Sequence, residues 1–218
     1  MTDMLVEAIG SLLYRVIWMV GAGARTALLD LAVEGREHLP RRGPFILAAN
    51  HRSLLDFIPI ELACRWKLVY LVHRAWYDPW PFRWFFRVLG CVRVEGGRAS
   101  FRAFERVVEA LADGQAVCVF PEGERSWTTE LGRGRPGAAY LALRSGVPLI
   151  PVAISGTEKM LPRGSWRLWY GHVSVRFGPP IRLTETGNQE PTREVLRRGT
   201  DRLMRAIAEL LSVDETCG

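Results

Sequence analysis

The stretch PFILAANHRSLLD, residues 44 to 56, joins an apolar run to a histidine and an aspartate five positions apart. Its apolar half follows a glycine and begins with proline, which is typical of the start of a short buried strand. The residues from the second half up to Ala63 favour a helix, and Ser53 followed by Asp56 matches a capping box at its start. The stretch therefore predicts a strand, a loop that carries His51, and a helix.

The same alternation continues along the rest of the chain. Apolar runs predict further strands at residues 67–72, 91–95, 116–120, 149–154 and 173–177. Helical spacing and helix-stop residues predict helices at residues 101–112, 136–145 and 192–211. Strands that alternate with helices predict an α/β fold, a single domain over residues 34–218 with a mixed, largely parallel central sheet flanked by helices.

Composition narrows the kind of partner. The chain has 218 residues, 48% of them hydrophobic, which suffices for one buried core. A formal charge of +6 with eight tryptophans suits anionic partners, either phospholipid headgroups or nucleic acid. The sequence has no zinc-finger spacing, aromatic RNA-binding signature or uninterrupted basic tract, so we expect no nucleic-acid partner. The four cysteines lack metal-ligand spacing, which favours a reducing compartment and no metal site.

Two stretches have the composition of a membrane interface. Residues 1–33 are mostly apolar, but charges interrupt them too often for a span of about 30 Å. They also lack a signal-peptide cleavage pattern, so we predict a membrane-associating helical segment that lies in the interface. A helix packed on the protein's own core and a single tilted span are the alternatives. Residues 73–90 interleave aromatics with arginines, which suits either a membrane interface or an aromatic core cluster.

His51 and Asp56 are suited to proton transfer. A histidine in the loop can fold back so that one ring nitrogen donates to the carboxylate, which fixes the tautomer and leaves the other nitrogen as a base. Inside a helix, five residues correspond to about 500°, and the two side chains would lie on different faces. The alternative interpretation is that Asp56 and Ser53 only cap the helix and His51 is an ordinary loop residue.

A second loop, FPEGERS at residues 120–126, follows another predicted strand. Arg125 suits a phosphate, and Gly123 allows the backbone to pass close to a ligand. Glu122 could accept a hydrogen bond from a substrate hydroxyl or position Arg125, unless the loop is only a turn with a surface ion pair. His51, Glu122 and Thr157 all follow predicted strands, at the sheet edge where α/β proteins bind ligands.

The order and spacing of the two loops are highly specific. NHRSLLD is followed about seventy residues later by FPEGERS, with LGCVRVEGG between them and VPLIPVAISGT after them. This arrangement, over residues 35 to 182, resembles the glycerolipid acyltransferase family, whose members include 1-acylglycerol-3-phosphate acyltransferase.

The resemblance implies roles for individual residues. His51 would be the general base that deprotonates the acceptor hydroxyl, and Asp56 would orient it. The acyl group would move directly from acyl-CoA or acyl-carrier protein, with no acyl-enzyme, no metal and no other cofactor. Pro151 and the loop at Gly156-Thr157 would shape the acyl-donor side. Binding of the acceptor's phosphate and glycerol would fall to Glu122, Gly123, Arg125 and Ser126.

Two positions depart from the family pattern. Glu124 replaces a threonine that is usual in the second loop, and so places a negative charge near the expected phosphate. Gly96 replaces an arginine that usually follows the V-x-V-[DE] strand, and we expect Arg93 or Arg98 to supply the missing cation.

The leading functional hypothesis is transfer of a fatty acyl group to 1-acylglycerol-3-phosphate, which makes phosphatidic acid. Another lysolipid or an aminolipid is the alternative acceptor. Two other classes stay open, a metal-dependent hydrolase with His51, Asp56 and Glu122 as ligands and a catalytically silent membrane-binding module. Since acceptor and product are lipids, we expect a peripheral or monotopic protein on the cytoplasmic face of the cell membrane.

Overall fold

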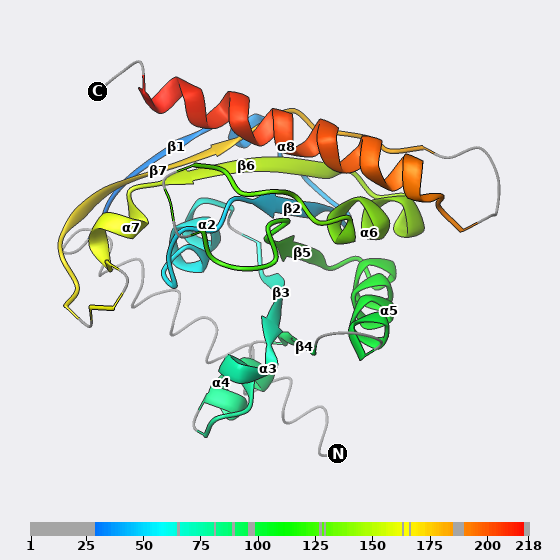
Figure 1. Cartoon of the computed structure of the whole chain (residues 1–218), viewed down its shortest axis with the longest axis horizontal. Helices are drawn as coiled ribbons and strands as arrows, with labels where there is room; N and C mark the ends of the chain where they lie inside the picture. The colour runs from blue at the N-terminus through cyan, green and yellow to red at the C-terminus, as the bar shows by residue number, and fades with distance from the viewer. Residues whose placement is uncertain are drawn as a thin grey trace.

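A seven-stranded sheet with the order β1-β7-β6-β2-β5-β3-β4 runs through the protein (Figure 1). The computed structural model describes residues 29–64, 66–80, 82–88, 90–95, 99–126, 128, 130–162, 164–165, 167–184 and 190–215. The strands are β1 (Leu29–Glu34), β2 (Ile46–Ala49), β3 (Leu68–His73), β4 (Val92–Val94), β5 (Ala116–Val119), β6 (Leu149–Ser155) and β7 (Gly171–Phe177). All neighbours pair in parallel except β6 and β7. The predicted mixed, largely parallel sheet is confirmed.

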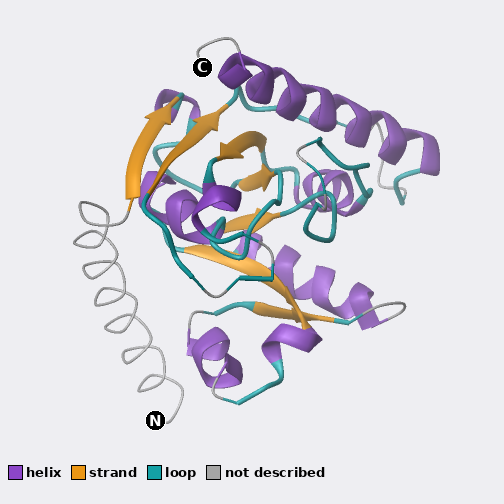
Figure 2. Ribbon diagram, turned by 60° about the vertical axis from the view of Figure 1, so that its left-hand side comes forward, coloured by secondary structure: helices purple, strands orange, loops and turns teal. Residues whose placement is uncertain are grey.

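Helices lie on both faces of this sheet (Figure 2). They are η1 (Arg36–His38), α2 (Phe57–Cys64), α3 (Arg74–Tyr77), α4 (Phe82–Val88), α5 (Ala99–Ala112), α6 (Gly137–Ser145), α7 (Thr157–Met160) and α8 (Arg193–Glu215). None of these helices combines the length and apolar character that a membrane crossing requires.

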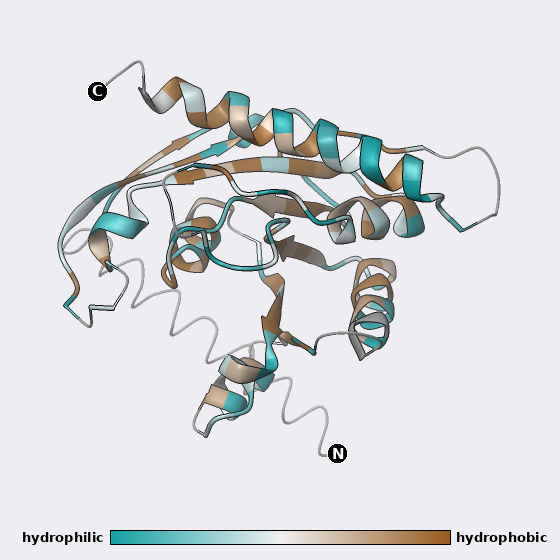
Figure 3. Ribbon diagram, viewed as in Figure 1, coloured by the Kyte–Doolittle hydropathy of each residue, from teal (hydrophilic) through white to brown (hydrophobic). Residues whose placement is uncertain are grey.

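Strand β2 shows why the central strands are apolar throughout. Successive side chains of a strand point to opposite faces. Ile46 and Ala48 pack into the cluster formed with α5, α6 and α8, whereas Leu47 and Ala49 pack into the cluster that contains α2. Because both faces are covered, every residue of β2 is buried. In Figure 3 the central strands are hydrophobic in colour, and the turns of α8 mix polar and apolar residues.

The first predicted helix begins later than expected. Residues 54–56 form a turn, and α2 starts at Phe57. Only half of a capping box is present: the Asp56 carboxylate accepts from the Ser53 N–H at 2.9 Å, while the Ser53 hydroxyl accepts from Leu55 N at 3.2 Å. The turn leaves Asp56 beneath the loop that carries His51.

The predicted boundary after residue 33 falls inside a strand. Residues 29–34 form β1, which pairs in parallel with β7 at the edge of the sheet. Asp30 and Glu34 made this stretch unlike a buried strand, but they point outward and pair with His172 and Arg176 of β7. Residues 1–28, which hold the rest of the predicted membrane-associating segment, lie outside the described residues.

Candidate active site

Three neighbouring parallel strands bring the candidate residues to one end of the sheet, where the carboxyl ends of these strands lie. β5, β2 and β6 lie side by side and point the same way. His51 follows β2, Glu122 follows β5 and Thr157 follows β6. Their carboxyl ends therefore converge, as the sequence predicted.

His51 and Asp56 form the expected pair. His51 Nδ1 lies 2.8 Å from Asp56 Oδ2, and the exposed fractions of the two side chains are 19% and 0%. A carboxylate only accepts hydrogen bonds, so Nδ1–H donates to it, and Nε2 is the nitrogen that can take up a proton. The geometry is that of an oriented general base.

The buried carboxylate of Asp56 accepts hydrogen bonds from four donors among the described residues. Besides His51, Oδ2 accepts from the backbone N–H groups of Arg52 at 2.8 Å and Ser53 at 2.9 Å. Oδ1 accepts from Thr157 Oγ1 at 2.5 Å, across from the next strand. A buried charge needs such partners, and these four fix the plane of the carboxylate. Asp56 is therefore held more rigidly than a helix cap requires.

The histidine loop contacts both the second loop and strand β6. The His51 ring stacks on Phe120 with a centroid distance of 4.0 Å and an interplanar angle of 18°. His51 N donates to Glu122 Oε1 at 2.8 Å, and His51 O accepts from Ser126 N at 2.8 Å. On the other side, Asn50 exchanges two hydrogen bonds with the backbone of Ile154 in β6. The loop that carries His51 is therefore held on one side by the segment after β5 and on the other side by β6.

Glu122 has a different position from the one expected of a substrate-binding residue. It is 5% exposed, its Oε1 accepts from His51 N, and its Oε2 accepts from Gly132 N at 2.9 Å. Each carboxylate oxygen therefore joins a separate segment, the histidine loop and the chain after FPEGERS. In this structure Glu122 ties the two loops together.

The remaining residues of the second loop shape its surface. Gly123 has φ 75°, and a Cβ there would lie 2.7 Å from Cδ of Arg135. Arg125 is partly buried, and its guanidinium lies 5.7 Å from the centre of the Trp76 ring. Ser126 Oγ donates to Thr128 O at 2.9 Å, so this hydroxyl stabilises the loop. Arg125 is the one cationic residue of the loop at residues 120–126.

Glu124, which replaces the family's threonine, forms an exposed ion pair. Its Oε1 lies 2.9 Å from Arg135 Nη2. The added negative charge is thus matched by a cation of the same loop region.

Arg93, one of the two arginines predicted to supply the missing cation, contacts carboxylates near the edge strand β4 in this structure. It makes two hydrogen bonds to Asp78, at 2.6 and 2.7 Å, and a further one to Glu95. β4 is the edge strand of the sheet, separated from β2 by β3 and β5. Two carboxylates engage Arg93 there, and its hydrogen bonds lower the pKa of Asp78. Gly96 and Arg98 lie outside the described residues.

The chemistry of the pair argues against a metal centre built on it. The oxygens of Asp56 and Glu122 face N–H and O–H donors, which occupy the positions that a cation would need. Among the described residues, no group of three His, Cys, Asp or Glu side chains is arranged to hold a metal.

Burial raises the pKa of Cys64 and of Cys91 to about 12, which makes these thiols poor nucleophiles.

Two positions that complete the site had weak signals in the sequence. Asn50 precedes His51 directly, yet its partner is 104 residues away. The side chain of Thr157 reaches Asp56, and 101 residues separate the two. Local spacing does not reveal such pairs, although the Ser-Gly-Thr sequence at the end of β6 marks the turn.

Comparison with known proteins shows the family of the chain. A family model described as Acyltransferase matches residues 30–155, more than half of the chain. The chain therefore belongs to the acyltransferase family. The crystal structure of the 1-acyl-sn-glycerophosphate acyltransferase PlsC from Thermotoga maritima is similar, with a TM-score of 0.73 and 28% sequence identity. The similarity covers 94% of this chain and 82% of that one.

Two curated relatives are similar in sequence. The chloroplastic 1-acyl-sn-glycerol-3-phosphate acyltransferase LPAT1 of Arabidopsis thaliana is 30% identical over 68% of this chain and 43% of its own length. The 1-acyl-sn-glycerol-3-phosphate acyltransferase of Saccharomyces cerevisiae is 27% identical over 84% of this chain and 61% of its own length. The chain thus spans about half the length of the curated relatives it matches.

Proposed function

We propose that the protein is an O-acyltransferase that acylates 1-acyl-sn-glycerol-3-phosphate and so forms phosphatidic acid. The observation that carries the proposal is the buried, four-donor carboxylate of Asp56, which orients His51 next to a loop with an arginine. The names of the relatives support the choice of acceptor. No cofactor is needed beyond the thioester co-substrate.

His51 acts first as base and then as acid. Nε2 takes the proton of the acceptor hydroxyl while that oxygen attacks the thioester carbonyl carbon. A C–O bond forms, the tetrahedral intermediate collapses, and the C–S bond breaks. The departing thiolate takes the proton from Nε2–H, so the products are the new ester and a free thiol. Asp56 stabilises the transient imidazolium, which Nδ1–H links to it at 2.8 Å.

The second loop binds the acceptor in this proposal. Arg125 meets the phosphate, since a guanidinium can hold two phosphate oxygens at once. Gly123, whose φ of 75° suits a residue without a side chain, lets the loop backbone turn beside the glycerol of the acceptor. Both acyl-CoA and acyl-carrier protein present the same thioester, so either serves as donor. Pro151 and the turn at Gly156 stay proposals for the donor side.

A second acceptor class is favoured by the exposed pair of Glu124 and Arg135. A headgroup with both an amine and a phosphate could separate the pair, with the amine at Glu124 and the phosphate at Arg135. Another lysolipid or an aminolipid is therefore the alternative to 1-acyl-sn-glycerol-3-phosphate.

Acceptor and product are lipids, so we place the reaction at a membrane surface. The proposal is a peripheral or monotopic protein on the cytoplasmic face of the cell membrane, where the thioester donors are made available.

The test is an acceptor panel with the purified full chain. Acyl-CoA and acyl-carrier protein are each offered with 1-acyl-sn-glycerol-3-phosphate, lysophosphatidylcholine and lysophosphatidylethanolamine, and products are measured by mass spectrometry. We expect phosphatidic acid from the wild type and none above background from His51→Ala. Acylation of a different lysolipid alone would overturn the acceptor assignment. Equal turnover by His51→Ala would overturn the mechanism.

A further inference from the structure

Apart from Val213 on α8, the large apolar side chains that are exposed in the described part of the chain form two groups. Trp76, Trp80, Phe82 and Trp84 lie in or beside α3 and α4, and Trp80 is 85% exposed. Leu168, Trp169 and Tyr170 lie between α7 and β7, and Tyr170 is 64% exposed. We name these groups the α3–α4 patch and the 168–170 patch. An exposed apolar cluster of this kind marks an interaction site.

The α3–α4 patch combines packed aromatic rings with exposed arginines. Phe86 stacks on Tyr77 at 5.8 Å and on Phe82 at 6.5 Å between ring centres, which packs the two short helices together. Trp80 and Trp84 stay outside this packing and are exposed, as are Arg83 and Arg87. Residues 74–88 carry three arginines and a single carboxylate, Asp78, which Arg93 neutralises.

The 168–170 patch repeats this chemistry on a different element. Trp169 N donates to Met160 O at 2.9 Å, which anchors the segment to α7. The Arg167 guanidinium lies 5.1 Å from the centre of the Trp169 ring. Tryptophan and arginine side by side are typical of the lipid headgroup region, where the indole is half immersed and the guanidinium meets phosphate.

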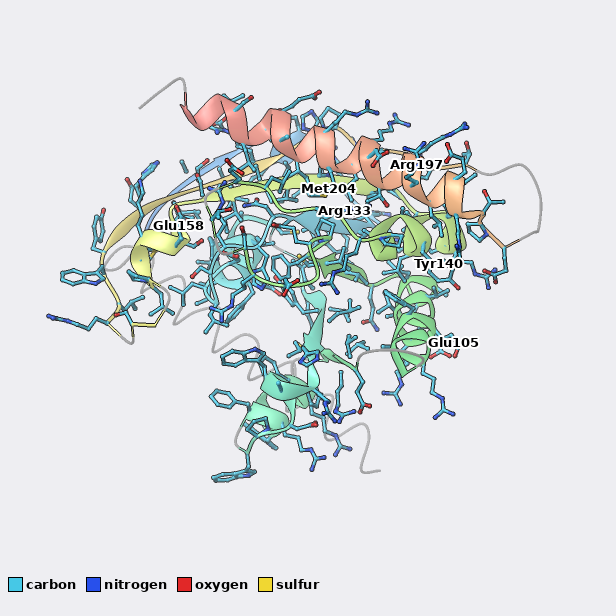
Figure 4. All side chains as sticks on the ribbon, viewed as in Figure 1. Glu105, Arg133, Tyr140, Glu158, Arg197 and Met204 are labelled. Atoms are coloured by element: carbon cyan, nitrogen blue, oxygen red, sulfur yellow. The ribbon has the colours of Figure 1, made fainter. Side chains whose placement is uncertain are left out.

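Both patches are placed at the catalytic edge of the sheet. α3 follows β3, and α7 with its loop follows β6, and both strands run parallel with β2. Figure 1 shows α3 and α4 at the bottom of the protein and the α7–β7 segment at its lower left, on the side away from α8. In Figure 4 Arg197 on α8 and Glu105 on α5 lie away from this side.

We infer that the α3–α4 patch and the 168–170 patch together dock the protein on an anionic phospholipid bilayer, with the His51 edge facing the lipid. Aromatic rings enter the interface, and Arg74, Arg83, Arg87 and Arg167 meet lipid phosphates. Two separated contacts fix the orientation, which one contact would leave free. The inference rests on the proposed function in one respect, that the acceptor resides in the membrane.

Vesicle sedimentation with the full chain tests the inference. The vesicles are phosphatidylcholine alone or phosphatidylcholine with phosphatidylglycerol. We expect at least tenfold weaker partitioning for Trp80→Ala with Trp84→Ala, and similarly for Trp169→Ala with Tyr170→Ala. Arg83→Gln with Arg87→Gln should remove most of the preference for the anionic vesicles. Val213→Ala, an exposed apolar residue on α8, is the matched control and should bind as the wild type does.

A soluble assay separates this inference from the proposed function. With a short-chain, water-soluble lysolipid the aromatic double variants should retain wild-type turnover, because their side chains lie outside the catalytic loops. Wild-type partitioning by both aromatic double variants, or equal binding of the wild type to neutral and anionic vesicles, would overturn the inference. Loss of turnover on the soluble acceptor would also overturn it, since the patches would then serve the site directly.

A second observation, independent of the surface, concerns Thr157. Its side chain is fully buried, and Oγ1 donates to Asp56 Oδ1 at 2.5 Å. The preceding Gly156 has φ 94°, and a Cβ there would lie 2.1 Å from His172 O, so the turn that presents Thr157 is fixed by packing. We propose that Thr157 is a positioning residue, which holds the carboxylate in the orientation that His51 requires.

Two near-isosteric variants test this role. Thr157→Val keeps the shape and removes the donor, and Thr157→Ser keeps the donor and removes the methyl group. We expect kcat to fall roughly tenfold in the valine variant, the change that corresponds to one lost hydrogen bond to a charged group. The KM for either substrate should stay unchanged, the acid limb of the pH–rate profile should move, and serine should restore kcat. Normal kcat with valine, or a serine variant as slow as valine, would overturn the proposal.

Discussion

The protein contains two pairs of histidine and aspartate with almost the same contact. His51 Nδ1 lies 2.8 Å from Asp56 Oδ2, and His172 Nδ1 lies 2.9 Å from Asp30 Oδ2. The exposed fractions of the side chains are 19% and 0% in the first pair, but 64% and 59% in the second. The second pair joins the edge strand β1 to its neighbour β7, and both of its side chains are exposed to water.

The difference shows that a short His–Asp contact does not make a site. In water an ion pair gains little, because solvent competes for both charges. Asp56 is removed from water and held by three further donors, two from its own loop and one from Thr157. Burial and hydrogen bonding hold the first pair in one orientation, which the proposed role of His51 as a base requires.

The largest expected effect comes from removing His51, with His172 as the comparison. His51→Gln should lower kcat by about 10²–10⁴-fold, the usual contribution of general-base catalysis. His172→Gln should leave kcat unchanged, since its ring is exposed on β7, away from the His51 loop. Steady-state rates with saturating donor and acceptor measure both. If the two variants lost activity equally, the distinction between the pairs would fail.

Replacing the two aspartates should have different effects on the free energy of unfolding as well as on kcat. Asp56→Asn turns an NH₂ group toward one of the buried donors, which should lower the free energy of unfolding by about 1–3 kcal/mol. It should also slow turnover, since the His51 ring loses its charged partner. Asp30→Asn should change neither quantity measurably. Urea unfolding followed by circular dichroism measures stability, and equal midpoints for the two variants would contradict the comparison.

Glu122 provides a smaller effect on the same pair. Glu122→Gln leaves one acceptor oxygen for two N–H groups, those of His51 and Gly132. We expect kcat to fall roughly tenfold, because the backbone that carries the base loses its support. The control is Glu124→Gln in the same loop, whose carboxylate is exposed. A change confined to the acceptor KM would instead show that Glu122 touches substrate.

The smallest effect should come from the exposed pair of Glu124 and Arg135. A double-mutant cycle with Glu124→Gln and Arg135→Gln should give a coupling free energy below about 1 kcal/mol, and salt should weaken it further. Urea unfolding at low and high salt measures the coupling. A coupling free energy as large as the loss of about 1–3 kcal/mol expected for Asp56→Asn would mean that exposure does not decide the strength of these pairs.

Much of the fold followed from short-range pattern. Buried runs such as residues 116–120 and helix stops such as Gly146 placed most strands and helices within a few residues. The sequence did not predict β1, because Asp30 and Glu34 interrupt its apolar residues. Their partners, His172 and Arg176, lie on β7, which is 142 residues away in the sequence. α3 and α7 are four-residue helices, too short for helical periodicity to be visible.

By itself the sequence determined the alternation of strands and helices, the two loops after β2 and β5, and the pairing of His51 with Asp56. These features depend on residues close together in the chain, or on a motif order that the family shares. Only the tertiary structure decided that Thr157 completes the carboxylate's hydrogen bonds, that Glu122 braces two loops, and that Arg93 is held by Asp78. The physical reason is that buried polar groups must find donors and acceptors wherever the folded chain places them, often a hundred residues away.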